Sequence, residues 1–89
     1  MLGELYMKYS EIIVGRICSL CKKRGISITK LATMSGIHQS TLDNIVRGIS
    51  KNPRIVTLHK VANAFGMTVS EFLDIKELNA FSFEDEEED

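Results

Sequence analysis

Apolar residues in this chain recur every three or four positions, and this periodicity constrains the fold more than any other feature. Such spacing places apolar side chains on one face of a helix, whereas a half-buried strand would alternate them with polar ones. The sequence has no strand-like alternation of any length. The pattern predicts an all-α chain with five helices, over residues 7–23, 28–34, 39–47, 55–65 and 69–74. Its 89 residues provide one domain with a modest core.

Several residues mark where the predicted helices begin and end. Ser27 can cap the second helix, and Thr68 with Glu71 forms a capping-box pattern before the fifth. Gly25 and Gly36 stand where helices must end, because glycine enters a left-handed turn at little cost. The predicted core consists of the apolar residues on the inner helix faces and in the turn: Ile13, Ile17, Leu20, Cys21, Leu31, Ala32, Ile37, Leu42, Ile45, Val46, Leu58, Val61, Ala62, Phe65, Phe72 and Leu73.

Charge is distributed unevenly along the chain. The formal net charge is −1, but residues 84–89 are all acidic. Residues 16–60 contain nine lysines and arginines against a single acidic residue, Asp43. A compact unit with such a positive excess attracts polyanions, although charge alone is equally compatible with a solvated basic surface.

Several classes of protein are not expected from this sequence. No run of about 18 apolar residues could span a membrane, and the start lacks a basic segment followed by an apolar one, so we expect a cytoplasmic protein. Cys18 and Cys21 form a lone CxxC without the further ligands that zinc requires, so we expect reduced thiols, no metal and no cofactor. No His/Cys or Ser/His/Asp pattern indicates catalysis, and an enzyme is not expected.

Residues 28–45 carry the strongest functional pattern. A helix-turn-helix needs a small residue where its helices touch, which Ala32 provides, and a glycine in the turn, which Gly36 provides four positions later. Apolar residues for the inner side follow: Ile37, Leu42 and Ile45. The outer face of the second helix is polar and short: Gln39, Ser40, Asp43 and Asn44. Such a helix fits the major groove of DNA and presents amides to base edges.

Over about residues 13–74 the chain resembles the phage repressor/Cro-type helix-turn-helix family, also called the XRE family. The resemblance lies in a set of short motifs in the right order and spacing: Gly15-Arg16-Ile17, Leu31-Ala32, Gly36-Ile37, Arg47-Gly48, Lys51-Asn52-Pro53, Thr57-Leu58, Val61-Ala62 and Phe65-Gly66-Met67-Thr68. It implies a five-helix, lambda-repressor-like DNA-binding domain over residues 10–75. Residues 1–9 are then a helical N-terminal extension, and residues 76–89 a C-terminal extension. We expect the acidic tail of that extension to be disordered, because it has no apolar residue to bury.

The resemblance also implies roles for individual residues. Base-reading residues would be Gln39, Ser40, Asp43 and Asn44, with Asp43 either accepting from a cytosine amino group or repelling phosphate. Contacts to the DNA backbone would come from Ser27, Thr29, Lys30, His38, Thr41, Arg47, Lys51, Asn52 and Arg54. The sequence departs from the family at Ile28, where many members have a phosphate-binding Gln, and at His38, where Ser or Thr is the usual helix cap.

The predicted function is a sequence-specific regulator of transcription that binds double-stranded DNA, a repressor acting as a homodimer on a palindrome. Candidate dimer surfaces are the aromatic residues near the two ends of the chain: Tyr6, Tyr9, Phe72, Phe81 and Phe83. Two alternatives remain open. The chain could be an antitoxin that represses its own promoter and masks a toxin protein through its C-terminal tail. It could also be a protein-interaction module that kept the fold and lost DNA binding.

Overall fold

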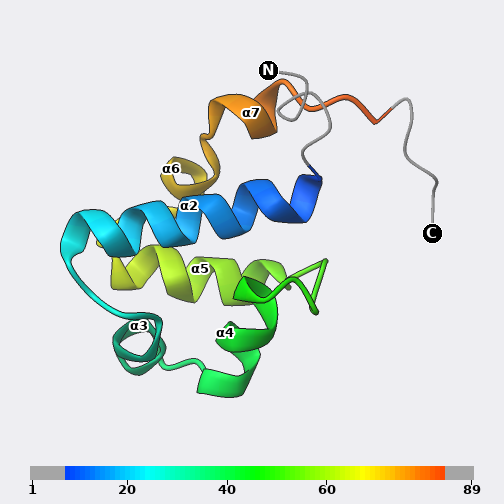
Figure 1. Cartoon of the computed structure of the whole chain (residues 1–89). Coiled ribbons are helices and arrows are strands. Elements are labelled where there is room, and N and C mark those ends of the chain that lie inside the picture. The colour runs from blue at the N-terminus through cyan, green and yellow to red at the C-terminus, as the bar shows by residue number, and fades with distance from the viewer. Residues whose placement is uncertain (1–7, 84–89) are drawn as a thin grey trace.

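The computed structural model describes residues 8–83, and every regular element in that part of the chain is a helix (Figure 1). The helices are α2 (Tyr9–Arg24), α3 (Ile28–Ser35), α4 (Gln39–Val46), α5 (Ile55–Ala64), α6 (Val69–Leu73) and α7 (Lys76–Asn79). The all-α prediction is confirmed. The predicted helix over 7–23 begins at Tyr9, and the other four begin at the expected residues.

The described residues form six helices, one more than predicted. The additional helix is α7, which Ile75 precedes as an extended N-cap residue. The Asn79 side chain donates a hydrogen bond of 2.9 Å to the Asp74 carboxylate, which ties the end of α7 to the chain just before it. Four residues with no buried side chain leave almost no periodic signal in the sequence, so the helix was not predictable from the apolar pattern.

Long helix α2 lies across the middle of the molecule, with α3 and α4 on one side and α6 and α7 on the other (Figure 1). Its buried face packs with α5 into a single apolar core. Among the largest side chains in this core, six are fully buried: Ile17, Leu31, Leu42, Val61, Phe65 and Phe72. The core prediction is confirmed in the main, since only Ile37, Val46 and Leu73 are half-buried at its margin. Ile12, which was not predicted, is also buried.

The structure shows the predicted capping residues at the ends of the helices. The Ser27 hydroxyl accepts a hydrogen bond of 3.0 Å from the Lys30 N–H, and Thr68 and Glu71 form the capping box. Gly25 and Gly36 have φ of 68° and 74°, the left-handed conformation that side chains with a Cβ rarely adopt. These caps satisfy backbone groups that have no partner inside the helix.

Two arginines of α2 hold the ends of α5 and α6. Arg16 donates to the carbonyl oxygens of Glu71 and Phe72, each at 2.9 Å. Arg24 donates to the carbonyl oxygen of Phe65 at 2.6 Å. Each guanidinium also lies over a phenylalanine ring, 5.9 Å from the centroid of Phe72 and 5.6 Å from that of Phe65. The positive excess of residues 16–60 is therefore only partly available to a polyanion, because these two cations act within the fold.

Phe72 was a wrong candidate for a dimer surface. Its ring is 0% exposed and belongs to the core, so it cannot contact a second chain. Phe81 and Phe83 instead make edge-to-face and tilted ring contacts with Tyr9, at centroid distances of 5.3 and 5.5 Å from the tyrosine ring and 4.8 Å from each other. Tyr6, the remaining candidate, lies outside the described residues.

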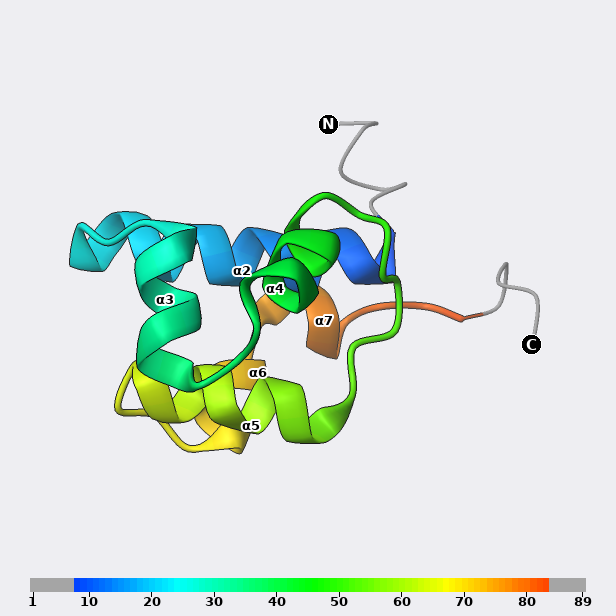
Figure 2. The same ribbon diagram turned by 90° about the horizontal axis from the view of Figure 1, so that it is seen from below.

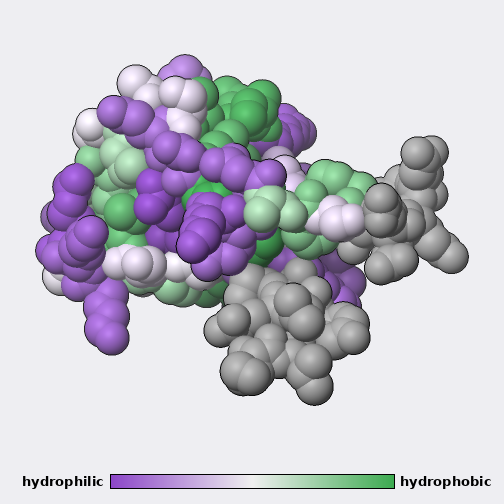
Figure 3. All heavy atoms as spheres, turned by 90° about the horizontal axis from the view of Figure 1, so that it is seen from above, coloured by the Kyte–Doolittle hydropathy of each residue, from purple (hydrophilic) through white to green (hydrophobic). Residues whose placement is uncertain are grey.

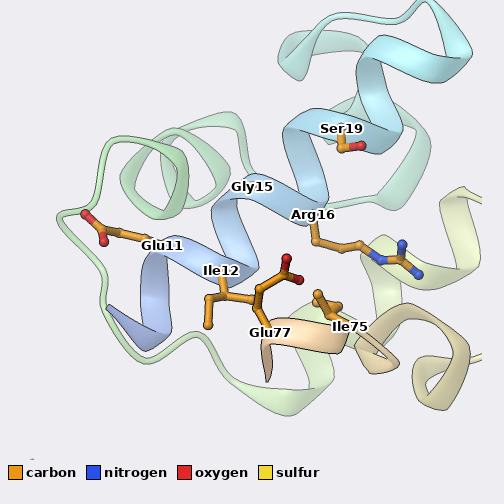
Figure 4. A pocket seen from close by; sticks show the side chains of 7 residues that line it. All are labelled: Glu11, Ile12, Gly15, Arg16, Ser19, Ile75 and Glu77. Atoms are coloured by element: carbon orange, nitrogen blue, oxygen red, sulfur yellow. The ribbon is translucent and has the colours of Figure 1, made fainter. Parts of the chain in front are cut away.

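A shallow hollow of about 290 Å³ separates α2 from α7 on the side away from α4 (Figure 4). Gly15 forms its floor on α2, and an added Cβ there would meet no atom within 4 Å. Glu77 projects from α7 toward α2, while Glu11 points away (Figure 4). No helix within residues 8–83 is long and apolar enough to cross a membrane.

Both cysteines are free thiols, with Cys18 exposed and Cys21 buried. Burial raises the pKa of the Cys21 thiol, and the neighbouring Cys18 raises it further. A raised pKa keeps the thiol protonated at neutral pH, and a protonated thiol is a poor nucleophile and metal ligand. Cys21 therefore serves as a small apolar residue of the core.

Candidate nucleic-acid interface

The turn between α3 and α4 fixes how these two helices meet (Figure 2). Ala32 is buried at their junction, with 4% of its surface exposed, so the helices can approach closely. Gly36, in the left-handed conformation, and Ile37 both donate backbone hydrogen bonds to the Ala32 carbonyl, at 3.0 and 3.1 Å. The chain thus turns within residues 36–38, and α4 starts at Gln39. This is the helix-turn-helix geometry that the sequence predicted.

Helix α4 has one buried and one exposed face. Leu42 and Ile45 are 0% and 2% exposed and anchor the helix in the core. The polar side chains of the helix lie on its accessible side: Gln39, Ser40, Thr41 and Asn44 are exposed and Asp43 is half-buried. All four residues predicted to read bases therefore lie on one short helix, whose opposite face holds it rigidly against the domain.

A hydrogen bond across the motif orients Gln39. Its Nε2 donates to the Thr29 hydroxyl oxygen at 2.8 Å, joining the first turns of α4 and α3. The amide then keeps its carbonyl oxygen and one N–H for another partner, the pair that matches an adenine edge. The Thr29 hydroxyl also keeps its own proton. Sequence reasoning placed Thr29 and Gln39 in the interface separately and missed their contact.

The N-terminus of α4 is open to an anion. His38 occupies the N-cap position, and its side chain makes no capping hydrogen bond. The first N–H groups of a helix have no partner inside it, and they carry the positive end of the helix dipole. This end of α4 can therefore accept a phosphate oxygen, as helix N-termini commonly do.

The loop over residues 47–54, which follows α4, has a backbone fixed by hydrogen bonds. Backbone N–H groups of Ile49 and Ser50 both donate to the Asn44 carbonyl, at 2.9 and 3.0 Å, and Gly48 takes a φ of 80°. Ser50 in this loop is half-buried, whereas its basic side chains and its amide are exposed: Arg47, Lys51, Asn52 and Arg54. Exposed cations on a loop of fixed shape suit contacts to a phosphate backbone.

Three large apolar residues around this loop were not anticipated. Ile49, Ile55 and Val56 are 62%, 65% and 50% exposed. Ile49 lies between two predicted helices, and Ile55 follows the apolar spacing of its helix, so the sequence carried no clear signal that these side chains would face outward. Figure 3, which views the molecule from the opposite side, that of α6 and α7, shows hydrophobic side chains, in green, among the hydrophilic ones on that face.

The structure brings the predicted site residues together on the α3–α4 side and its flanking loop, the side that faces the viewer in Figure 2. Every residue predicted to contact the DNA backbone is exposed: Ser27, Thr29, Lys30, His38, Thr41, Arg47, Lys51, Asn52 and Arg54. Ser27 accepts one hydrogen bond at its hydroxyl oxygen to cap α3, and its hydroxyl proton stays available to donate to a phosphate. The remaining residues form a continuous candidate surface of amides, hydroxyls and cations.

Known proteins are similar to this chain in sequence. A family model for the Cro/C1-type helix-turn-helix DNA-binding domain matches residues 16–77. The HTH-type transcriptional regulator SlrR of Bacillus subtilis (strain 168) is 40% identical over 63 residues, covering 70% of this chain and 41% of SlrR. The HTH-type transcriptional regulator SinR of the same organism is 36% identical over 61 residues, covering 68% of this chain and 55% of SinR. The chain thus spans about half the length of these relatives, or less.

Two solved structures superpose on this fold. The N-terminal DNA binding domain of SinR from Bacillus subtilis matches with a TM-score of 0.66 at 35% identity, covering 73% of this chain and 94% of that domain. The prophage Lp1 protein 11 matches with a TM-score of 0.72 at 30% identity, covering 81% of this chain and 95% of that one. The helical architecture is therefore shared with proteins of similar sequence.

Proposed function

This chain belongs to the family of Cro/C1-type helix-turn-helix DNA-binding domains, and from that premise we propose that it is a non-enzymatic regulator of transcription that binds double-stranded DNA in the cytoplasm. The observation that carries the proposal is the accessible polar face of α4, held rigid by Leu42 and Ile45 and flanked by the basic loop over residues 47–54. The DNA-binding domain of SinR has the same fold at 35% identity, which supports it.

In this proposal α4 lies in the major groove. Gln39, Ser40, Asp43 and Asn44 contact base edges, and the exposed amides of Gln39 and Asn44 favour adenine because an amide can make two hydrogen bonds to it. The DNA backbone is held on both sides of that helix by the residues predicted to contact phosphates: Ser27, Thr29, Lys30, His38, Thr41, Arg47, Lys51, Asn52 and Arg54. These contacts supply affinity and register.

One such domain reads only a half-site, so we propose a homodimer that represses transcription from a palindromic operator. Tyr9 and Phe83 support an interface near the start of α2, since they are 38% and 59% exposed. Sedimentation of the protein with and without operator DNA tests this part, and a strict monomer in both states would contradict it.

Selection from random duplex DNA by the purified chain tests the proposed function as a whole. We expect enrichment of an inverted repeat whose half-sites lie about one helical turn apart, because two copies must face the same side of the duplex. Enrichment of a single half-site would support sequence-specific binding but would contradict the proposed homodimer. Absence of any enriched sequence would contradict base reading and leave only salt-sensitive, sequence-independent affinity.

Replacing Thr29 by Val should weaken binding to the selected sequence by roughly twofold to tenfold. The change removes the hydroxyl that accepts from Gln39, and one hydrogen bond contributes roughly 0.5–1.5 kcal/mol net. Fluorescence anisotropy with selected and scrambled duplexes measures the effect. Thr33→Val is the matched control, because the exposed Thr33 hydroxyl bonds only within α3, to the Thr29 carbonyl. An equal loss on both duplexes would show that Thr29 contacts phosphate and does not orient Gln39.

A further inference from the structure

We propose that the acidic residues 84–89 bind the basic loop over residues 47–54 of the same chain and thereby compete with DNA phosphates for Lys51 and Arg54. The competition with DNA rests on the proposed function, whereas the contact between residues 84–89, here called the acidic tail, and the loop does not. Residues 84–89 lie outside the described part of the chain, so the proposal is argued from the point where they begin and from the charges around that point.

The acidic residues follow directly from an anchored position. Phe81 and Phe83 pack against Tyr9 at the start of α2, with ring centroids 5.3 and 5.5 Å from that of the tyrosine. Three rings in mutual edge-to-face or tilted contact hold the chain against α2 up to the last described residue. The described part of the chain therefore ends at a defined place on the surface of the domain.

That place lies beside the basic loop. Tyr9 lines a hollow of about 210 Å³ whose other walls include Lys51, Asn52 and Pro53. Figures 1 and 2 both show the segment that follows α7 at the same end of the molecule as the loop between α4 and α5. Six extended residues span up to about 20 Å, which is close to the smallest extent of the domain, 21 Å. A tail of this length that begins at the same end of the molecule can therefore reach the loop.

Charge adds to this proximity in favouring the contact. The tail contributes six carboxylates, and the loop presents the exposed cations Arg47, Lys51 and Arg54. Between residues 12 and 70 the only acidic residue is Asp43, so few carboxylates of the fold compete for these cations. A single exposed ion pair stabilises a contact only weakly, but a tethered segment acts at a high effective concentration.

The first experiment compares the full chain with a chain that ends at Phe83. We expect the shortened chain to bind the selected duplex several-fold more tightly at low salt, with the difference shrinking as salt screens the charges. A full-length variant in which all six acidic residues become Gln or Asn should bind as the shortened chain does. Equal affinity of the three proteins at low salt would overturn the proposal.

A free acidic tail could also repel DNA without touching the loop, so a second readout is needed. Nitrogen–proton correlation spectra of the full and shortened chains without DNA report the contact directly. We expect the amide signals of Lys51, Asn52 and Arg54 to shift when the tail is removed, and those of Lys22 and Lys23, exposed lysines at the other end of α2, to stay unchanged. Unchanged loop signals would overturn the contact even if the affinity rises.

Removing the positive charges of Lys51 and Arg54 tests whether the acidic tail and DNA compete for these two side chains. In the background Lys51→Gln with Arg54→Gln, removal of the tail should no longer improve DNA binding. A full improvement in that background would show that the tail acts elsewhere. If no form of the chain binds DNA, the proposed function fails, while the spectra still decide whether the tail contacts the loop.

Discussion

Replacing both Gln39 and Asn44 by Ala should remove most of the sequence discrimination of this protein while leaving its affinity for arbitrary duplex DNA nearly unchanged. Both amides are exposed on α4, and a bidentate amide contact to a base contributes roughly 1–3 kcal/mol of discrimination. The cations that hold the DNA backbone are untouched, so the salt-dependent part of binding remains. Ala is a strong helix former, and Leu42 and Ile45 still anchor the helix in the core.

Competition between the selected and a scrambled duplex measures this effect. Asn63→Ala is the matched control, because Asn63 is an exposed amide residue on α5, outside the predicted interface. It should bind like the unmodified protein. If the Gln39 and Asn44 variant still prefers the selected sequence by the full factor, these two side chains do not read bases, and recognition would have to come from DNA shape.

Replacing Phe72 by Ala should destabilise the fold by about 3–5 kcal/mol, the usual cost of truncating a buried aromatic ring. Phe72 is 0% exposed, and its ring lies beneath the Arg16 guanidinium, which also bonds to the Phe72 and Glu71 carbonyls. The whole free energy of unfolding of a small domain is about 5–15 kcal/mol. The variant should therefore melt some 12–40 °C lower, at about 4–8 °C per kcal/mol.

Thermal unfolding followed by circular dichroism measures the loss, with Phe83→Ala as the matched control. Phe83 is 59% exposed, so its truncation should cost far less and should change self-association if this ring lies in a dimer interface. A Phe72 variant that melts like the Phe83 variant would contradict the assignment of Phe72 to the core.

Local chemistry in the sequence determined the helices and most of their ends. Each predicted helix has its own apolar stripe, and Ser27, Gly25 and Gly36 cap helix ends through backbone groups within a few residues. Such signals depend on residues close together in the chain, so the sequence alone is enough to recognise them. The failures lie where this signal is weak: four-residue α7 has no buried side chain to mark it.

The candidate interface was predictable as a set of residues for the same reason. Ala32, Gly36 and the polar face of α4 lie within one short segment, and helical geometry alone places Gln39, Ser40, Asp43 and Asn44 on its outer side. The loop over residues 47–54 follows directly in the chain. The sequence did not contain the hydrogen bond from Gln39 to Thr29, because that contact depends on how α3 and α4 cross.

Contacts between distant residues were decided only by the tertiary structure. Arg16 and Arg24 count as free cations in the sequence, yet each bonds to carbonyl oxygens more than forty residues away. Phe72 and Phe83 were both candidates for a dimer surface, but Phe72 fills the core, as its place on the fifth predicted helix indicated, and only Phe83 lies exposed against Tyr9. Helical periodicity fixes which face of a helix is apolar, whereas only packing decides which distant element covers that face and which cations and rings remain at the surface.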